Sequence, residues 1–194
     1  MPRRQSWFTA DPHIGHLKVA ELRGFTDVED HDAELARRWD AAVTDVDLVW
    51  VLGDLSAGGK GAQLRALRWL AERPGTKRLI AGNHDGVHPM HRDATALLPD
   101  YLKVFESVGL AARRRIGGVE VLLSHFPYQD STDPADTHNR YEQWRLPNLG
   151  VWLLHGHTHS GQRVRGHAIH VGVDAWELGP VPLSAVAELL RTPG

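Results

Sequence analysis

Short clusters of aspartate, asparagine and histidine recur along this sequence, and their side chains are of the kinds that bind metal ions in proteins. Carboxylate and amide oxygens with imidazole nitrogens suit manganese, iron, zinc, nickel or cobalt better than calcium or copper(I). The chain has 13 histidines and no cysteine, which excludes disulfides and thiolate metal sites. The candidate ligands are Asp11, His13, Asp54, Asn83, His125, His157 and His159.

These seven candidates exceed what one ion needs. A single catalytic zinc takes about three protein ligands, whereas two ions at roughly 3.5–4 Å share one bridging carboxylate and use more. Asp54 stands in the middle of the set and is the predicted bridge. Two adjacent cations lower the pKa of a water and offset charge on phosphate oxygens. The predicted chemistry is therefore hydrolysis of a phosphate ester by a hydroxide that bridges two metals.

The elements that must position these side chains are short apolar strands, because each cluster follows one directly. Leu35, Trp39 and Val43 recur at helical spacing between two such runs, which favours an α/β architecture. Ligands in α/β folds bind beyond the carboxyl ends of strands, so five segments are expected to converge. In an extended segment, residues two apart point the same way, which would pair Asp11 with His13. The predicted strands are 7–10, 48–52, 78–81, 119–123 and 151–154.

The remaining sequence predicts fewer elements. A helix is expected around 64–71, a hairpin over 162–165 and 168–171, and a last helix capped by Ser184. Residues 126–150 are rich in Pro, Asp, Thr and Asn and are predicted to form a long loop.

The length and the net charge of the chain limit the classes of protein to which it can belong. The 194 residues fit a single domain over 1–194, and the net charge of −2 gives no general attraction to nucleic acid. The sequence shows neither a signal core nor a stretch of about 20 apolar residues, so no membrane association and a cytoplasmic location are expected. The oligomeric state cannot be assigned.

The order of these motifs resembles that of the calcineurin-like metallophosphoesterases. The matching pieces are Asp-x-His at 11–13, Gly-Asp at 53–54, Gly-Asn-His-Asp at 82–85, His125 and Gly-His-x-His at 156–159. Pro12 departs from the residues more usual at that position of the family. The resemblance implies two packed mixed β-sheets flanked by helices, a four-layer αββα sandwich of the small type without a cap domain.

The resemblance also implies a role for each matching residue. Asp11, His13 and His159 would hold the first metal, and Asp54 would bridge to the second. His84 would be no ligand but would stabilise the transition state or donate a proton, with Asp85 orienting it. The second metal would be held by Asn83, His125 and His157. The cofactor would be two divalent ions, manganese first, with iron, zinc, nickel, cobalt or magnesium as alternatives.

The substrate is predicted less sharply than the metal site. A small phosphate ester, a monoester or diester of a small molecule or nucleotide, fits a compact chain with an open site. His16, Asn83, Tyr128 and Arg140 are the predicted substrate contacts, and Arg140 is equally well explained as a solvated loop residue. Two other functions remain open: a nuclease that uses the same metals, and a non-catalytic protein-binding module.

Other polar residues favour ordinary roles. His155 ends a strand and is predicted to be structural rather than a ligand. Asp174 is equally consistent with a helper behind the ligands and with a turn. Surface positions are expected for most of His31, His88, His91, His138, His167 and His170.

Overall fold

The computed structural model describes residues 4–136 and 140–191. His138 lies outside the described residues. Most of the first half is helix and strand, and residues 126–150 carry only one short 3-10 helix among those described. The elements are β1 (Ser6–Thr9), α1 (Leu17–Leu22), α2 (Val28–Ala42), β2 (Leu48–Val51), α3 (Lys60–Ala71), β3 (Thr76–Ile80), α4 (Ala94–Tyr101), β4 (Ser107–Gly109), β5 (Ala111–Ile116), β6 (Val119–Ser124), η1 (Glu142–Trp144), β7 (Trp152–His155), β8 (Val164–Arg165), β9 (Ala168–His170), η2 (Val173–Ala175), β10 (Val181–Pro182) and α5 (Leu183–Leu189).

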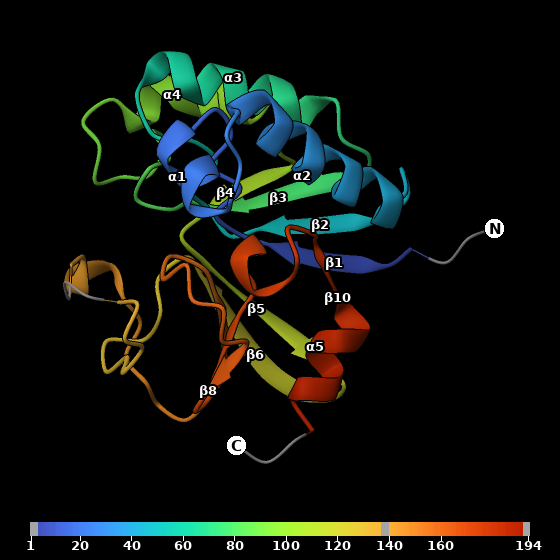
Figure 1. The fold of residues 1–194 in the computed structure, drawn as a ribbon. Coiled ribbons are helices and arrows are strands. Elements are labelled where there is room, and N and C mark those ends of the chain that lie inside the picture. Colours follow the sequence, from blue (N-terminus) through green and yellow to red (C-terminus); the bar gives the residue numbers. More distant parts are fainter. Residues whose placement is uncertain (1–3, 137–139, 192–194) are drawn as a thin grey trace.

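Two mixed β-sheets form the centre of the protein and lie one above the other in the view of Figure 1. The first has the order β10-β1-β2-β3-β4, in which β1 to β4 are parallel and β10 is antiparallel to β1. The second has the order β5-β6-β7-β9-β8, with β6, β7 and β9 parallel and both edge strands antiparallel. The predicted class, two packed mixed sheets flanked by helices, is confirmed.

Strand β2 shows why its continuous apolar run is needed. Val49 and Val51 pack with the helices on the outer face of the first sheet. Leu48 and Trp50 point the other way, into the core between the two sheets. Because successive strand residues face opposite sides, a strand covered on both faces must be apolar throughout.

Helices cover the two sheets unequally. Helices α2, α3 and α4 contribute Leu35, Trp39, Leu67 and Tyr101 to the core on the outer face of the first sheet. Helix α5 lies beside the second sheet, contacts β10, β1 and β5, and buries Val186 (Figure 1). The helical layer on that side of the described structure is thus the single short helix α5.

The start of one predicted helix is corrected, and one predicted hairpin is confirmed. Helix α5 begins after Pro182 rather than at Ser184, which lies exposed within the helix and makes no capping hydrogen bond. The arginines at 113–115 belong to β5, where Arg114 is half-buried over the ring of Trp50 at 5.7 Å. The predicted hairpin is confirmed as β8 and β9.

Within the described residues, no helix is long and apolar enough to cross a membrane.

Candidate metal centre

Three parallel strands of the first sheet end at one edge, and each is followed by predicted ligands. Asp11 comes after β1, Asp54 after β2 and Asn83 after β3. Backbone hydrogen bonds join the segments beyond the strands: the Asp11 N–H donates to the Gly53 carbonyl at 3.0 Å and the His13 N–H to the Asp54 carbonyl at 3.2 Å. These loops are therefore fixed to one another.

The second sheet brings its own strand ends to the same place. His125 follows β6 and His157 follows β7, and these strands are parallel neighbours. The backbone N–H of His157 donates to both carboxylate oxygens of Asp11, at 3.1 and 2.9 Å. The two sheets thus meet at the candidate ligands.

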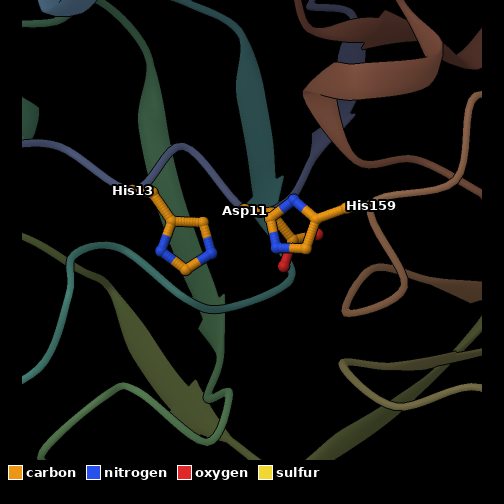
Figure 2. Close-up of side chains that lie close together, drawn as sticks. All are labelled: Asp11, His13 and His159. Atoms are coloured by element: carbon orange, nitrogen blue, oxygen red, sulfur yellow. The ribbon is translucent and has the colours of Figure 1, made fainter. Parts of the chain in front are cut away.

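Six of the seven predicted ligands form two groups whose potential ligand atoms lie within 4.8 Å of one another. One group is Asp11, His13 and His159, and Figure 2 shows these three side chains directed toward a common space. The other group is Asp54, His125 and His157. The seventh, Asn83, places its side-chain oxygen 3.1 Å from His125 Nε2, beside the second group.

The carboxylate of Asp54 lies between the two groups. Its Oδ2 is 3.9 Å from His13 Nε2, in the first group, and its Oδ1 is 3.5 Å from His125 Nε2, in the second. Asp54 is almost fully buried, so its two oxygens are held in these directions.

An unusual backbone conformation aims these side chains. Among the described residues other than glycine, only eight have positive φ, and five of these are predicted ligands. The extended geometry expected for the Asp-x-His segment is wrong: both of its ends are left-handed, a conformation that favours glycine and is tolerated best by short polar side chains. Backbone strain of this kind is found mainly at functional sites, where the surrounding structure holds it. The five are Asp11 (φ 57°), His13 (49°), Asp54 (55°), His157 (72°) and His159 (54°).

Two glycines leave room for the carboxylates. A Cβ at Gly156 would collide with Asp11 Oδ2 and lie 2.6 Å from the Ala10 Cβ. A Cβ at Gly82 would collide with Asp54 Oδ1. These residues are glycine because ligand side chains approach the backbone too closely for any other.

The imidazole rings are oriented by hydrogen bonds on their Nδ1 side. His13 Nδ1 lies 3.2 Å from the Ser56 carbonyl and His125 Nδ1 lies 2.7 Å from the Leu52 carbonyl. A ring that donates from Nδ1 presents an unprotonated Nε2, as a metal ligand requires. His13 Nε2 is buried and has no hydrogen-bond partner among the described residues. A divalent cation would satisfy it, so the residues present fit such an ion.

Burial also sets the charges of the site. It lowers the pKa of His157 to about 2 and that of His13 well below its ordinary value, which keeps both rings neutral. Burial raises the pKa of Asp11 to about 6 and that of Asp54 to about 7. Buried carboxylates facing neutral imidazoles require a cation to hold their charge.

His159 is supported by a residue that sequence reasoning left undecided. Its Nδ1 lies 2.9 Å from Asp174 Oδ2. Burial lowers the pKa of His159, but the hydrogen bond to Asp174 and the charge of Asp11 outweigh it and raise the pKa. Asp174 therefore orients His159 rather than merely shaping a turn.

Arg23 holds Asp174 in place and was not foreseen. Its guanidinium donates two hydrogen bonds of 2.8 Å to Asp174 and others to the carbonyls of Asp11 (2.8 Å) and Pro12 (3.2 Å). It also lies 3.0 Å from Nε2 of His31, which is fully buried, so the predicted surface position of His31 is wrong. One buried arginine thus fixes both the first ligand loop and the support of His159.

His84 lies beside the groups without belonging to either. Its Nε2 is 4.0 Å from Asp54 Oδ2, and its side chain remains 42% exposed, so it can reach a bound molecule. Its ring is hydrogen-bonded to the backbone of Ala57. Gln63 accepts a hydrogen bond from Tyr101 and donates to the His84 carbonyl at 2.5 Å, which ties this loop to helices α3 and α4.

Asp85 does not have the predicted contact with His84. Its buried carboxylate accepts hydrogen bonds from the backbone N–H groups of Gly82 (2.8 Å), Asp54 (3.0 Å) and Leu55 (3.0 Å). Asp85 therefore braces the two loops that carry Asp54 and Asn83, and its support of His84 goes through the backbone.

A cleft of about 270 Å³ opens over these groups. Arg140 and Tyr141 line it, and Tyr141 packs against His157 with ring centroids 5.8 Å apart. Tyr128 does not line this cleft. It is buried and donates to the Val151 carbonyl at 2.6 Å, which is a structural position rather than the predicted substrate contact. His16 is half-buried beside His13, with ring centroids 5.6 Å apart.

The remaining histidines divide between surface and interior. His91 and His167 are exposed, as predicted, and His91 Nε2 lies 2.8 Å from the Asn83 carbonyl. His88 and His170 are buried, against prediction. His155 is buried and packs against His170 with ring centroids 5.3 Å apart and the rings tilted by 57°, outside both ligand groups.

The sequence profile of the calcineurin-like phosphoesterases matches residues 5–175. The chain belongs to this family. The match spans every residue of the two groups, so the geometry above is that of a metallophosphoesterase with two clusters able to hold divalent metals.

Relatives match this chain over most of its length. The Gene 66 protein of Mycobacterium phage L5 is 50% identical over 183 residues, covering 88% of this chain and 87% of its own. That of Mycobacterium phage D29 is 50% identical over 194 residues, covering 95% of each. A solved protein of unknown function from Aquifex aeolicus has the same calcineurin-like fold, with a TM-score of 0.71, 21% identity, and coverage of 96% of this chain and 100% of its own.

Proposed function

We propose that this family member hydrolyses phosphate esters of a small molecule or nucleotide with two divalent metal ions. The position of Asp54 carries the proposal, because its two oxygens face the two ligand groups separately. Asp11, His13 and His159 would hold one ion. The other would be held by His125, His157 and Asn83, with Asp54 shared between them.

The bound pair would supply a water of lowered pKa and would offset negative charge on the phosphate. Manganese is the first candidate because the ligands are nitrogen and oxygen only, and iron, zinc, nickel, cobalt and magnesium remain alternatives. The left-handed ligand backbones and the bracing by Asp85 pre-organise the side chains, so little free energy goes into ordering them when ions bind.

His84 would act on the phosphate and its leaving group. Burial lowers the pKa of His84, while the hydrogen bond to Ala57 raises it, and an anionic phosphate nearby would raise it further. With one ring nitrogen bonded to the Ala57 backbone, the Nε2 proton is present in the imidazolium form. That proton can bond a phosphate oxygen or pass to the leaving alkoxide.

The cleft favours a small substrate over a nucleic acid strand. Among its described lining residues Arg140 is the one lysine or arginine, which suits the clamping of a single phosphate oxygen. A strand of nucleic acid needs a track of such cations.

Turnover of two model esters tests the proposal. Metal-stripped protein is resupplied with Mn, Zn, Ni or Mg and assayed with bis-p-nitrophenyl phosphate and p-nitrophenyl phosphate. Metal should restore hydrolysis, and His84→Ala should lower kcat by about 10²–10⁴-fold with metal still bound. The exposed His167→Ala serves as a control that should retain activity. Full activity in metal-free protein would overturn the proposal.

A further inference from the structure

A second cavity adjoins the metal cleft across His84. Its volume is about 490 Å³, against about 270 Å³ for the cleft itself. Small-molecule sites usually measure about 300–1,000 Å³, so the cleft alone is small for more than a phosphate and the second cavity is not. The cavity is lined by residues that include Gly58, Gly59, Asn83, His84, Ala96 and Leu97.

Two residues are common to the linings of the metal cleft and the second cavity. Asn83 and His84 line both. These two residues therefore lie between a phosphate held at the metal groups and the second cavity, and a substituent of its ester would reach that cavity past His84.

Backbone rather than side chain forms the wall of the cavity beside His84. Gly58 and Gly59 have φ of +87° and +79°, which favours glycine at both. A Cβ on Gly58 would lie 3.7 Å from His84 Nδ1, and one on Gly59 would meet no atom within 4 Å. The absence of side chains at these two positions leaves the cavity open next to the ring.

The floor and rim indicate what the cavity accepts. The apolar part of the lining, here called the floor, comes from Ala96 and Leu97 of helix α4. Ala96 is exposed, whereas Leu97 packs onto the main apolar core, which fixes its position. Lys60 and Arg92 among the lining residues are balanced by Asp93 and Asp100. A second phosphate or another strong charge gains little from such a balanced set, whereas an apolar group gains from the floor.

We propose that this cavity, called the α4 pocket, binds an apolar or aromatic substituent of the substrate's phosphate ester. The inference rests on the proposed function and narrows its substrate to esters with such a group. His84 then stands between the phosphate and the substituent, where it contacts both.

Binding of two phosphonates to metal-loaded protein tests the α4 pocket without turnover. Phenylphosphonate and methylphosphonate share the anion and differ in the ring. We expect wild type to bind phenylphosphonate about tenfold more tightly by calorimetry, because the ring leaves water. Ala96→Trp fills the α4 pocket and should remove that preference while methylphosphonate still binds. Ala41→Trp, the same change at an exposed residue of helix α2 that lines neither the metal cleft nor the α4 pocket, should retain it.

Each other outcome has a definite meaning. Equal affinities for the two phosphonates in wild type, a preference kept in Ala96→Trp, or a preference lost in Ala41→Trp as well as in Ala96→Trp would overturn the α4 pocket and leave the phosphoesterase proposal standing. No binding of methylphosphonate by metal-loaded wild type, together with no hydrolysis of either nitrophenyl ester, would instead be a failure of the proposed function itself.

Discussion

Changing Asp85 to asparagine tests whether this residue supports the metal centre by bracing the ligand loops or by acting on the His84 ring. Asp85 Oδ2 accepts hydrogen bonds from the N–H groups of Gly82 and Asp54, and Oδ1 accepts one from Leu55. Asparagine has the same size but replaces one oxygen with an NH₂ group, which would face a donor. At least one of the three hydrogen bonds must therefore be lost, and the acceptor that remains is uncharged.

The expected cost follows from those contacts. A hydrogen bond to a charged acceptor contributes about 1.5–3 kcal/mol, and the two that remain weaken, so the loss is about 3 kcal/mol. For a domain of this length that lowers Tm by about 6–12 °C. Because Asp85 braces the loops of Asp54 and Asn83, metal affinity should fall about 10–100-fold. Burial and the charge of Asp54 raise the pKa of Asp85 to about 6, so measurements at pH 8 keep its carboxylate ionised.

Thermal unfolding of metal-free protein and titration with Mn²⁺ measure the two effects separately. Asp93→Asn is the matched control, since that side chain is exposed and makes no capping hydrogen bond. If Asp85→Asn unfolds within about 1 °C of wild type, binds metal normally and loses only turnover, the carboxylate acts on the His84 ring and the bracing of the loops is wrong.

Three further changes follow from particular contacts. Gly156→Ala should abolish metal binding at the first group, measured by metal analysis, because its Cβ collides with Asp11. Arg23→Lys should lower metal affinity about 10–100-fold, since an ammonium cannot reach Asp174 and both loop carbonyls together. Burial lowers the pKa of His170 from 6.5 to about 3. Between these pH values the His170 ring takes up a proton in the unfolded wild-type protein but not in the folded one, so lower pH favours unfolding of wild type. His170→Leu should therefore gain about 1.4 kcal/mol in the free energy of unfolding over wild type for each pH unit below 6.5.

Each of these changes has a control of the same chemistry at an open position. Gly161→Ala adds a Cβ that meets no atom within 4 Å, Arg37→Lys alters an exposed ion pair, and His167→Leu removes an exposed ring. The steric argument fails if Gly156→Ala binds metal as wild type does. The argument from the Arg23 contacts fails if Arg23→Lys has the same metal affinity as Arg37→Lys. The argument from protonation of His170 fails if the difference in stability between His170→Leu and wild type is independent of pH.

Most of the correct predictions of the fold and the ligands came from the apolar strands and from the polar clusters that follow them. A run such as Leu48–Val51 must be apolar because both faces are covered, and its position shows where the ligands of the next loop begin. Strand β5 was missed because three consecutive arginines, residues 113–115, make this edge strand look like ordinary surface. Helix α4 was missed because it is short and contains Pro99.

The supports of the site could not be read from the sequence because they depend on distant partners. Arg23 meets Asp174 across 151 positions, and no local pattern links the two. His31 is buried, and its two ring nitrogens lie within hydrogen-bonding distance of Arg23 and Asp32. The left-handed ligands had a faint signal, since aspartate and histidine tolerate positive φ better than most residues, but spacing alone suggested an extended segment.

Each ligand group draws on both halves of the chain, and the halves join at Leu110, between β4 and β5. Asp11 and His13 lie before this junction and His159 after it, and Asp54 is likewise separated from His125. Two polypeptides produced by cutting the chain there would meet across the sheet interface and through the cations they share. Their reassembly would then depend on the concentration of free metal. Dividing this protein at Leu110 would therefore give the two parts of a metal sensor.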